Sequence, residues 1–192
     1  MDDGGALHYK KCIDKVHEIC PKVGIEFLCS DLSGNVNALE FLLDNSPLTV
    51  FAHNVETVRR LTPRVRDPRA SFDQSLLILK KAKEFRPDII TKTSIMLGLG
   101  ETEEDLLSAF RELREAKVDL LTLGQYLSPG PRYHPVVSFP SPETFDSLAQ
   151  IAKEMGFKAI ASGPMVRSSY RAESLVAAAK GETFDIELKV VA

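Results

Sequence analysis

The feature that most constrains this chain is a regular alternation of short apolar runs with longer amphipathic stretches. The short runs are rich in Val, Ile, Leu and Phe, and the stretches between them have helical spacing. Nearly continuous apolar strands separated by helices are typical of parallel strands buried on both faces. We therefore predict an α/β fold with a parallel sheet, whose strands lie at 24–29, 48–52, 89–97, 118–123 and 157–161.

The predicted helices begin at recognisable signals. Ser71 and Gln74 form a capping-box pattern ahead of one helix. Thr102 precedes three acidic residues, which suit the positive end of a helix dipole. Pro142 stands in the first turn of a third helix, after a Pro-rich segment that we expect to be a long loop. Two earlier helices are expected at about 6–20 and 36–45.

Length and composition fit a single domain over residues 1–192, with an uninformative tail at 181–192. The net charge is −3, which disfavours a nucleic-acid or anionic-membrane surface. No apolar run reaches the roughly 18 residues of a membrane span, and the first residues carry no signal-peptide pattern. The cysteines match no C-x-x-C pattern, so we expect reduced thiols in a cytoplasmic protein: Cys12, Cys20 and Cys29.

Polar and glycine residues follow four of the predicted strands. Because the carboxyl ends of parallel strands meet at one edge, we expect these segments to lie together, where α/β folds build their sites. Repeated strand–helix units form either an open sheet or a barrel, and five strands are too few for a closed eight-stranded barrel. The four segments are His53-Asn54-x-Glu56, Gly98-x-Gly100-Glu101, Gly124-Gln125 and Arg167-Ser168-Ser169-Tyr170.

Each segment has a functional and a structural interpretation. The imidazole, amide and carboxylate at 53–56 suit a ribose or an amino acid, or a helix cap. The glycines at 98–100 allow close approach of a ligand, or simply a tight turn, and they match neither a dinucleotide fingerprint nor a P-loop. The hydroxyls and cations at 167–171 suit an anion or a metal cluster, or a helix N-cap. The arginines at 59–69 suit phosphate or carboxylate capture, or a solvated face.

Five blocks of the sequence together resemble the lipoyl synthases, which are radical S-adenosylmethionine (SAM) enzymes. The likeness runs from Asp2 to about Ala172, and the blocks fall in the family's order: 53–57, 65–70, 92–101, 121–127 and 163–170. The resemblance implies a partial (β/α)6 TIM-like barrel whose first strand–helix unit is missing.

The same resemblance implies an activity and its cofactors. A sulfurtransferase of this family inserts sulfur at C6 and C8 of a protein-bound octanoyl group to form the lipoyl cofactor. The family uses SAM and two [4Fe-4S] clusters, one of which generates the radical while the other donates sulfur. The implied partners are octanoylated lipoyl domains, namely those of 2-oxoacid dehydrogenase E2 components and the glycine cleavage H protein.

Site residues are carried over by position, and no catalytic residue is assigned. Gly4 and Gly5 match the segment that contacts the amino group of SAM, and Asn54 and Glu56 are expected on the SAM side of the barrel mouth.

Four further residues are carried over as cofactor-binding residues. Gly98, Gly100 and Glu101 are expected at the adenine end of SAM, and Gln125 near the centre of the site.

The metal site departs from the family pattern. Ser169 matches the serine ligand of the auxiliary cluster, with Ser168 as the alternative if the register is off by one. The family holds its two clusters with six cysteines in two motifs, and neither motif occurs here. We therefore expect this chain to be the C-terminal part of a longer enzyme and to be inactive by itself. A missing N-terminal part leaves a mitochondrial location open beside the cytoplasmic one.

Two other interpretations remain at this point. One is a non-catalytic module that binds SAM or a lipoyl domain at the barrel mouth. The other is an unrelated barrel enzyme for phosphorylated sugars that uses Arg64, Arg66 and Arg69 as an anion clamp.

Overall fold

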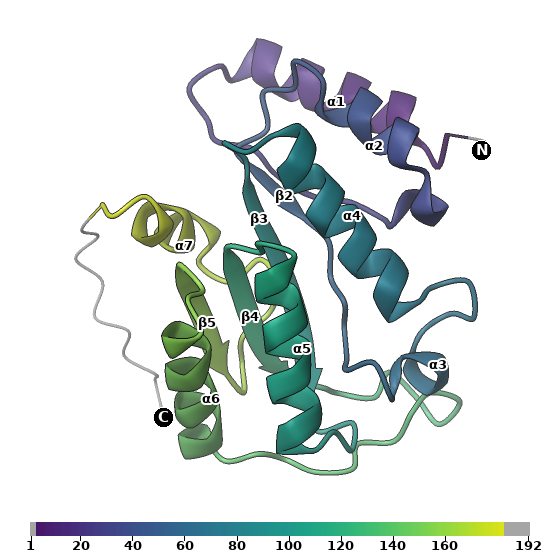
Figure 1. The fold of residues 1–192 in the computed structure, drawn as a ribbon, viewed down its shortest axis with the longest axis vertical. Coiled ribbons are helices and arrows are strands. Elements are labelled where there is room, and N and C mark those ends of the chain that lie inside the picture. The colour runs from purple at the N-terminus through teal and green to yellow at the C-terminus, as the bar shows by residue number, and fades with distance from the viewer. Residues whose placement is uncertain (1–2, 183–192) are drawn as a thin grey trace.

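The computed structural model describes residues 3–182, so most of the predicted tail at 181–192 lies outside the described part. Five parallel strands form one open sheet in the order β1-β2-β3-β4-β5 (Figure 1). The prediction of a parallel α/β fold is confirmed, and the sheet is consistent with a partial TIM-like barrel. The strands are β1 (Glu26–Leu28), β2 (Val50–Ala52), β3 (Ile90–Leu97), β4 (Leu120–Gln125) and β5 (Ala159–Gly163).

All five predicted helices are present, and two more helices and one 3-10 turn accompany them. The predicted ones are α1 (Ala6–Ile19), α2 (Val36–Leu43), α4 (Phe72–Phe85), α5 (Glu103–Glu115) and α6 (Pro142–Glu154). The additional elements are η1 (Leu32–Gly34), α3 (Thr62–Val65) and α7 (Ala172–Ala179).

The last two strands begin two residues later than predicted. Val118 and Phe157 are buried, but their amides bond back to carbonyls of the preceding helices, Leu113 and Ala152. Their apolar character therefore reflects burial in the helix–strand connection. A run of apolar residues cannot distinguish a buried connection from the strand that follows it.

The predicted start signals are correct for α5 and α6, and the capping box predicted for α4 is only half formed. Thr102 and Asp105 form a reciprocal capping box at α5. Ser71 accepts the amide of Gln74 at 3.0 Å, but the Gln74 side chain does not return to the cap. It donates instead to Asp31 at 2.7 Å, and so ties α4 to the turn after β1.

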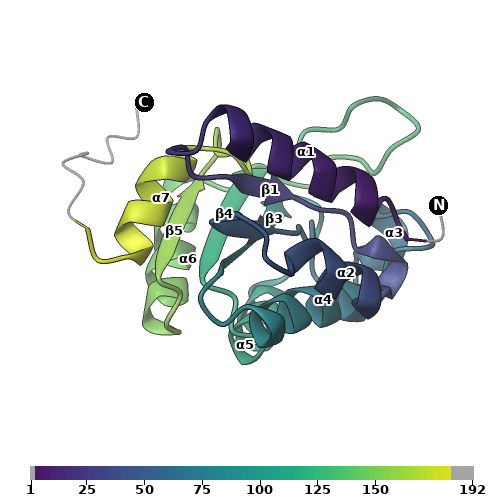
Figure 2. The same cartoon turned by 90° about the horizontal axis from the view of Figure 1, so that it is seen from above.

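The two faces of the sheet bury different apolar clusters. Alternate strand residues such as Phe51, Ile95 and Leu121 belong to the main core, where α2, α4, α5 and α6 cover the sheet (Figures 1 and 2). The residues between them, Val50 and Leu120 among others, face the opposite way and form a smaller cluster with α7. We call this second side the α7 face.

The order of strands leaves β1 at one edge of the sheet and β5 at the other. The strand predicted near 24–29 therefore lies at an edge of the sheet. Among the helices that the structure describes, none is long and apolar enough to cross a membrane.

Candidate functional site

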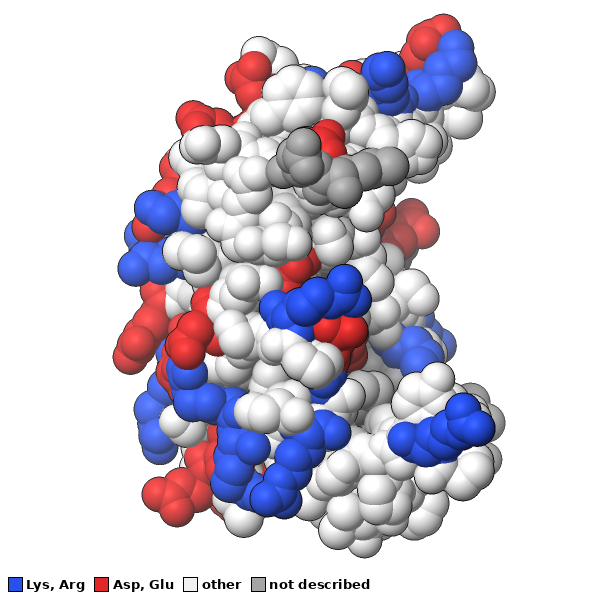
Figure 3. Space-filling model, turned by 90° about the vertical axis from the view of Figure 1, so that its right-hand side faces the viewer, with Lys and Arg blue, Asp and Glu red and all other residues white. Residues whose placement is uncertain are grey.

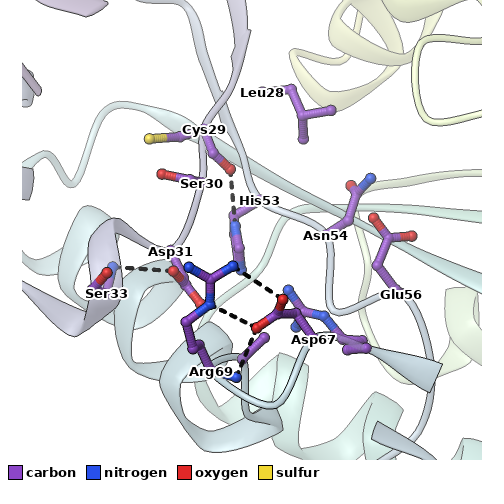
Figure 4. Close-up of a pocket in the computed structure, with 12 residues that line it drawn as sticks. Leu28, Cys29, Ser30, Asp31, Ser33, His53, Asn54, Glu56, Asp67 and Arg69 are labelled. Atoms are coloured by element: carbon purple, nitrogen blue, oxygen red, sulfur yellow. Dashed lines mark hydrogen bonds and ion pairs between the residues drawn. The ribbon is translucent and has the colours of Figure 1, made fainter. Parts of the chain in front are cut away.

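A pocket of about 530 Å³ opens at the carboxyl ends of β1 and β2 (Figure 4). It contains both acidic and basic side chains together with one amide. The segments that follow β1 and β2 form it with the loop that follows α3, and its lining is Leu28, Cys29, Ser30, Asp31, Ser33, His53, Asn54, Glu56, Arg66, Asp67, Arg69 and Ala70.

The backbone of residues 53–56 is held against β3. The amides of His53 and Glu56 donate to the carbonyls of Lys92 and Ser94, each at 3.0 Å. Glu56 has a φ of 65°, in the left-handed region that a non-glycine residue rarely adopts. Such backbone strain concentrates at functional sites, where the surrounding contacts maintain it.

Asn54 and Glu56 lie side by side at one end of the pocket (Figure 4). Burial raises the pKa of the Glu56 carboxyl, while the Asn54 side chain and the charge of Arg66 lower it, with burial dominating. The buried Oδ1 of Asn54 has no hydrogen-bond partner within the described residues. Buried acceptors are normally satisfied, so this oxygen and the carboxylate point to a ligand that donates hydrogen bonds.

His53 is buried beneath the pocket and bonds to protein on both ring nitrogens. Nδ1 lies 2.9 Å from the carbonyl of Cys29, and Nε2 lies 2.9 Å from Oγ of Ser75. Burial lowers the pKa of His53, so the imidazole is neutral near pH 7. All three polar residues predicted together at 53–56 therefore line the pocket, and both ring nitrogens of His53 are engaged by protein groups.

The proposed arginine clamp is not assembled. Arg69 pairs with Asp67 at 2.8 Å, Arg66 donates to Ser75 at 2.7 Å, and Arg64 is exposed. On the face that includes α3, acidic and basic side chains lie beside one another and not in a single basic patch (Figure 3). The interpretation as a phosphosugar enzyme loses its structural basis.

Glu101, the acidic residue of the turn after β3, bonds to the backbone of that same turn. Glu101 accepts the amides of Gly98 at 2.6 Å and Leu99 at 2.9 Å, so both carboxylate oxygens are engaged. Gly98 has a φ of +94°, and a Cβ there would lie 2.3 Å from the carbonyl oxygen of Ser138. A side chain has no room at this position, which gives Gly98 a structural reason for being glycine.

The long Pro-rich loop after β4 is clamped to that turn. Gln125 Nε2 donates to the carbonyl of Ser138 at 3.1 Å, and Val137 donates to the carbonyl of Gly98 at 2.8 Å. A Cβ added at Gly100 would lie 3.5 Å from the side chain of Val137. Gly98, Gly100, Glu101 and Gln125 thus form one cluster at the carboxyl ends of β3 and β4, but none of them lines the pocket beside Asn54. Their role at the adenine end stays a prediction.

Gly4 and Gly5 form the turn into α1, with φ of 59° and 92°. Asp3 accepts the amide of Gly5 at 2.9 Å, and a Cβ at Gly4 would lie 3.0 Å from Leu32. Gly4 therefore packs against η1, whereas a Cβ at Gly5 would lie 3.3 Å from the ring of Tyr9. The contact of both glycines with a SAM amino group stays a prediction.

The segment after β5 crosses the α7 face. Arg167 donates to the carbonyl of Gln125 at 3.0 Å, and Gly124 is glycine because a Cβ would lie 2.2 Å from the carbonyl oxygen of Val166. Ser169 is exposed and Ser168 is half-buried, just before α7. Helix α7 begins just after this segment, but its N-cap is Arg171 and no side chain caps it, so Ser168 and Ser169 do not form the predicted N-cap.

The described residues do not fit an iron–sulfur cluster by themselves. No group of three His, Cys, Asp or Glu side chains within residues 3–182 is placed to hold a metal ion. Cys12 and Cys20 are exposed on and after α1, and the sulfur of Cys12 lies 3.6 Å from Nε2 of His8. Burial and the charge of Asp31 raise the pKa of Cys29 to about 12, so it is a thiol and not the thiolate that iron binds. The serine ligand at 168–169 stays a prediction.

Two features of the site were missed from the sequence. Ser75 occupies the apolar stripe of α4 between Phe72 and Ile78, and a lone hydroxyl at that spacing is the only sequence signal for a buried polar contact. Lys92 and Glu26 form a 2.8 Å ion pair on the α7 face, where alternation of strand residues predicts an apolar side chain at position 92.

Comparisons with known proteins identify the family. Residues 2–113 match the model described as the radical SAM superfamily. The chain is 51% identical over 173 residues to the lipoyl synthase of Marinobacter nauticus, covering 90% of this chain and 49% of that protein. It is also 51% identical to the lipoyl synthase of Thermus thermophilus, covering 90% of this chain and 53% of that one.

A third relative is the mitochondrial lipoyl synthase of Bos taurus, which is 52% identical over 172 residues, covering 90% of this chain and 46% of that protein. The chain thus spans about half the length of the curated relatives it matches. The match confirms the resemblance to lipoyl synthases and excludes the interpretation as an unrelated barrel enzyme. On this evidence the chain belongs to the radical SAM superfamily.

Proposed function

We propose that this chain is the part of a lipoyl synthase that binds SAM, and that the complete enzyme inserts sulfur at C6 and C8 of a protein-bound octanoyl group. The identity of about half of all aligned residues to two lipoyl synthases, over 90% of the chain, carries the proposal. The partners would be octanoylated lipoyl domains of 2-oxoacid dehydrogenase E2 components and the glycine cleavage H protein. A cytoplasmic location stays a prediction, because one relative is mitochondrial.

The pocket at the ends of β1 and β2 fits SAM by its chemistry. SAM carries an ammonium group and ribose hydroxyls, all of them hydrogen-bond donors. The buried Oδ1 of Asn54 and the half-buried carboxylate of Glu56 are acceptors that face the same space, and the Asn54 oxygen has no partner among the described residues. A donor-bearing ligand would satisfy both, and the strained backbone at Glu56 would hold the carboxylate in position.

The chemistry that SAM and two [4Fe-4S] clusters supply when bound is hydrogen abstraction by a radical and donation of sulfur. The part of this chain that the structure describes would bind and orient SAM and exclude water from it. It does not present the thiolates that a cluster needs. We therefore expect the 192-residue chain by itself to bind SAM without forming lipoyl groups.

Calorimetric titration of the chain with SAM tests the proposal. The wild type is expected to bind at micromolar concentration, and Asn54→Leu or Glu56→Gln should weaken binding at least tenfold, through loss of hydrogen bonds to a charged group. Asn37→Leu and Glu40→Gln, on exposed positions of α2, are the matched controls and should leave binding unchanged. A folded wild type that binds no SAM would overturn the assignment.

A second measurement separates the enzyme from a non-catalytic binding module. The chain is incubated with SAM, iron, sulfide, a strong reductant and an octanoylated lipoyl domain, and the domain is weighed by mass spectrometry. We expect no gain of sulfur. The complete coding sequence should restore the two cysteine motifs and the mass gain, whereas a complete gene without those motifs would favour the binding module.

A further inference from the structure

Helix α1 presents a histidine and a cysteine one turn apart on its exposed side. Sγ of Cys12 lies 3.6 Å from Nε2 of His8, and both side chains are exposed. Within residues 3–182, neither side chain makes another hydrogen bond or an ion pair. α1 lies at the margin of the fold, with one side turned away from the sheet (Figures 1 and 2). The pair is therefore accessible to solvent, and it lies outside the pocket at the ends of β1 and β2.

The separation of these two atoms fits a shared metal ion. Zinc binds cysteine sulfur at about 2.3 Å and histidine nitrogen at about 2.0–2.1 Å, in a tetrahedral arrangement. Two such ligands of one zinc ion lie about 3.5–3.6 Å apart, and Sγ of Cys12 and Nε2 of His8 have this separation. Positions i and i+4 of a helix face the same way, as the two zinc-binding histidines of the motif H-E-x-x-H do. The pair can thus bind zinc without a change in the helix.

One chain supplies only half of a closed zinc site. A structural zinc site takes four protein ligands. No group of three His, Cys, Asp or Glu side chains in the part of the chain that the structure describes is placed to hold a metal ion, so these residues offer no third ligand. A second copy related by a two-fold axis supplies another cysteine and another histidine, and the set of two cysteines and two histidines is then complete.

Exposed apolar side chains continue the same side of α1 beyond the pair. Val16 and Ile19 lie four and seven positions after Cys12, and their exposed fractions are 46% and 67%. The 3.6-residue period of a helix places these three side chains in one stripe. Lys15, which borders the stripe, is paired with Glu18 at 2.8 Å. Two copies that pack by these stripes would cover the apolar side chains and bring the four zinc ligands to one point.

We propose that Zn²⁺ joins two copies of this chain through His8 and Cys12 of each copy. Each thiol releases its proton to solvent as its sulfur binds the metal. The site is structural and not catalytic, because protein ligands fill all four positions and leave none for a substrate. It uses no residue of the pocket beside Asn54, so it does not depend on the proposed function.

Zinc titration followed by analytical ultracentrifugation tests the proposal on the 192-residue chain. The chain is freed of metal with EDTA, dialysed and kept reduced, so that no disulfide forms. Without metal we expect a monomer of 21.2 kDa, and with zinc a dimer that contains one ion for two chains. EDTA should return the dimer to monomers. A chain that stays monomeric with excess zinc, or a dimer that EDTA does not dissociate, would overturn the proposal.

Cobalt in place of zinc identifies the ligands. A tetrahedral Co²⁺ site with thiolates has a sulfur-to-metal charge-transfer band and strong visible absorption. Wild type should show both signals, and Cys12→Ser should abolish the charge-transfer band and the dimer. His8→Asn should raise the zinc concentration needed for the dimer at least about tenfold, because each copy loses one ligand. Both positions are exposed, so these variants should fold like wild type.

The controls remove similar groups from the same helix. Cys20→Ser and His17→Asn delete an exposed thiol and an exposed imidazole, and both variants should form the zinc dimer as wild type does. Ile19→Ser keeps both ligands and removes part of the apolar stripe, so it should weaken the dimer. If Cys20→Ser abolishes the dimer and Cys12→Ser does not, the assignment of the ligands is wrong.

Discussion

Lys92 and Glu26 form an ion pair of 2.8 Å across the α7 face of the sheet, and the Lys92 side chain is only 1% exposed. Lys92 reaches over β2 to do so, because its strand, β3, is separated from β1 by β2. A buried ammonium group is tolerated only when it is paired and hydrogen-bonded, and here both oxygens of Glu26 accept from it, at 2.8 and 2.9 Å.

Removing one partner of this pair should destabilise the fold. Glu26→Gln leaves the Lys92 charge buried without its counter-ion, so we expect the free energy of unfolding to fall by about 3 kcal/mol in urea. Glu18→Gln removes the carboxylate of the exposed Lys15 pair and should cost less than about 1 kcal/mol. Replacing both residues, Lys92→Met with Glu26→Leu, should cost less than Glu26→Gln alone. Equal effects at positions 26 and 18 would contradict the role of burial.

Adding a methyl group at Gly98 should release the loop at 126–141. The new Cβ would lie 2.3 Å from the Ser138 carbonyl oxygen and 2.5 Å from Gln125 Nε2, on a backbone with φ of +94°. We expect Gly98→Ala to lower the free energy of unfolding by about 2–4 kcal/mol and to expose the loop to limited proteolysis. Gly130→Ala is the control, since its nearest neighbour would be 4.0 Å away. Equal proteolysis of the two variants would argue against the clamp.

Glu101 should contribute to stability even without a ligand. Its two oxygens accept the amides of Gly98 and Leu99, and glutamine offers only one oxygen for these two donors. Glu101→Gln should therefore cost about 1–2 kcal/mol in urea unfolding of the ligand-free chain. Glu40→Gln, at an exposed position of α2, should be within about 0.5 kcal/mol of wild type. If Glu101→Gln leaves the free energy of unfolding unchanged, this carboxylate does not stabilise the fold, and ligand binding would be its only role.

His53 should make the fold sensitive to mild acid. Burial lowers its pKa below the ordinary value of 6.5, so below about pH 6.5 the unfolded chain binds a proton that the folded chain does not. Stability due to His53 is complete above that pH and is lost as the pH falls, by at most about 1.4 kcal/mol per pH unit. The comparison is urea unfolding of wild type and His53→Asn between pH 7.5 and 5.5. The difference between their free energies of unfolding should become smaller as the pH falls. The exposed His17→Asn variant should follow the pH dependence of wild type. If the curves of wild type and His53→Asn stay parallel over this pH range, the argument is wrong.

The α/β fold could be predicted from the sequence because the signal is local. Continuous apolar runs specify buried strands, and caps such as Thr102 specify where helices begin. The sequence also predicted that segments 53–56 and 98–101 lie at the same end of the sheet, because the carboxyl ends of parallel strands lie on the same side. The boundaries near Val118 and Phe157 were wrong because burial, and not strand pairing, determines the apolar character of those residues.

What the sequence determined by itself is the order of strands and helices, the edge of the sheet that carries the polar segments, and the resemblance to lipoyl synthases. Only the tertiary structure decided which polar side chains face a ligand and which ones support the chain. Glu56 and Glu101 both follow strands and look alike in sequence, yet one lines a pocket and the other is saturated by backbone amides. The physical reason is that hydrogen-bond partners such as Ser75 for Arg66 come from distant segments, and their pairing depends on how the elements pack.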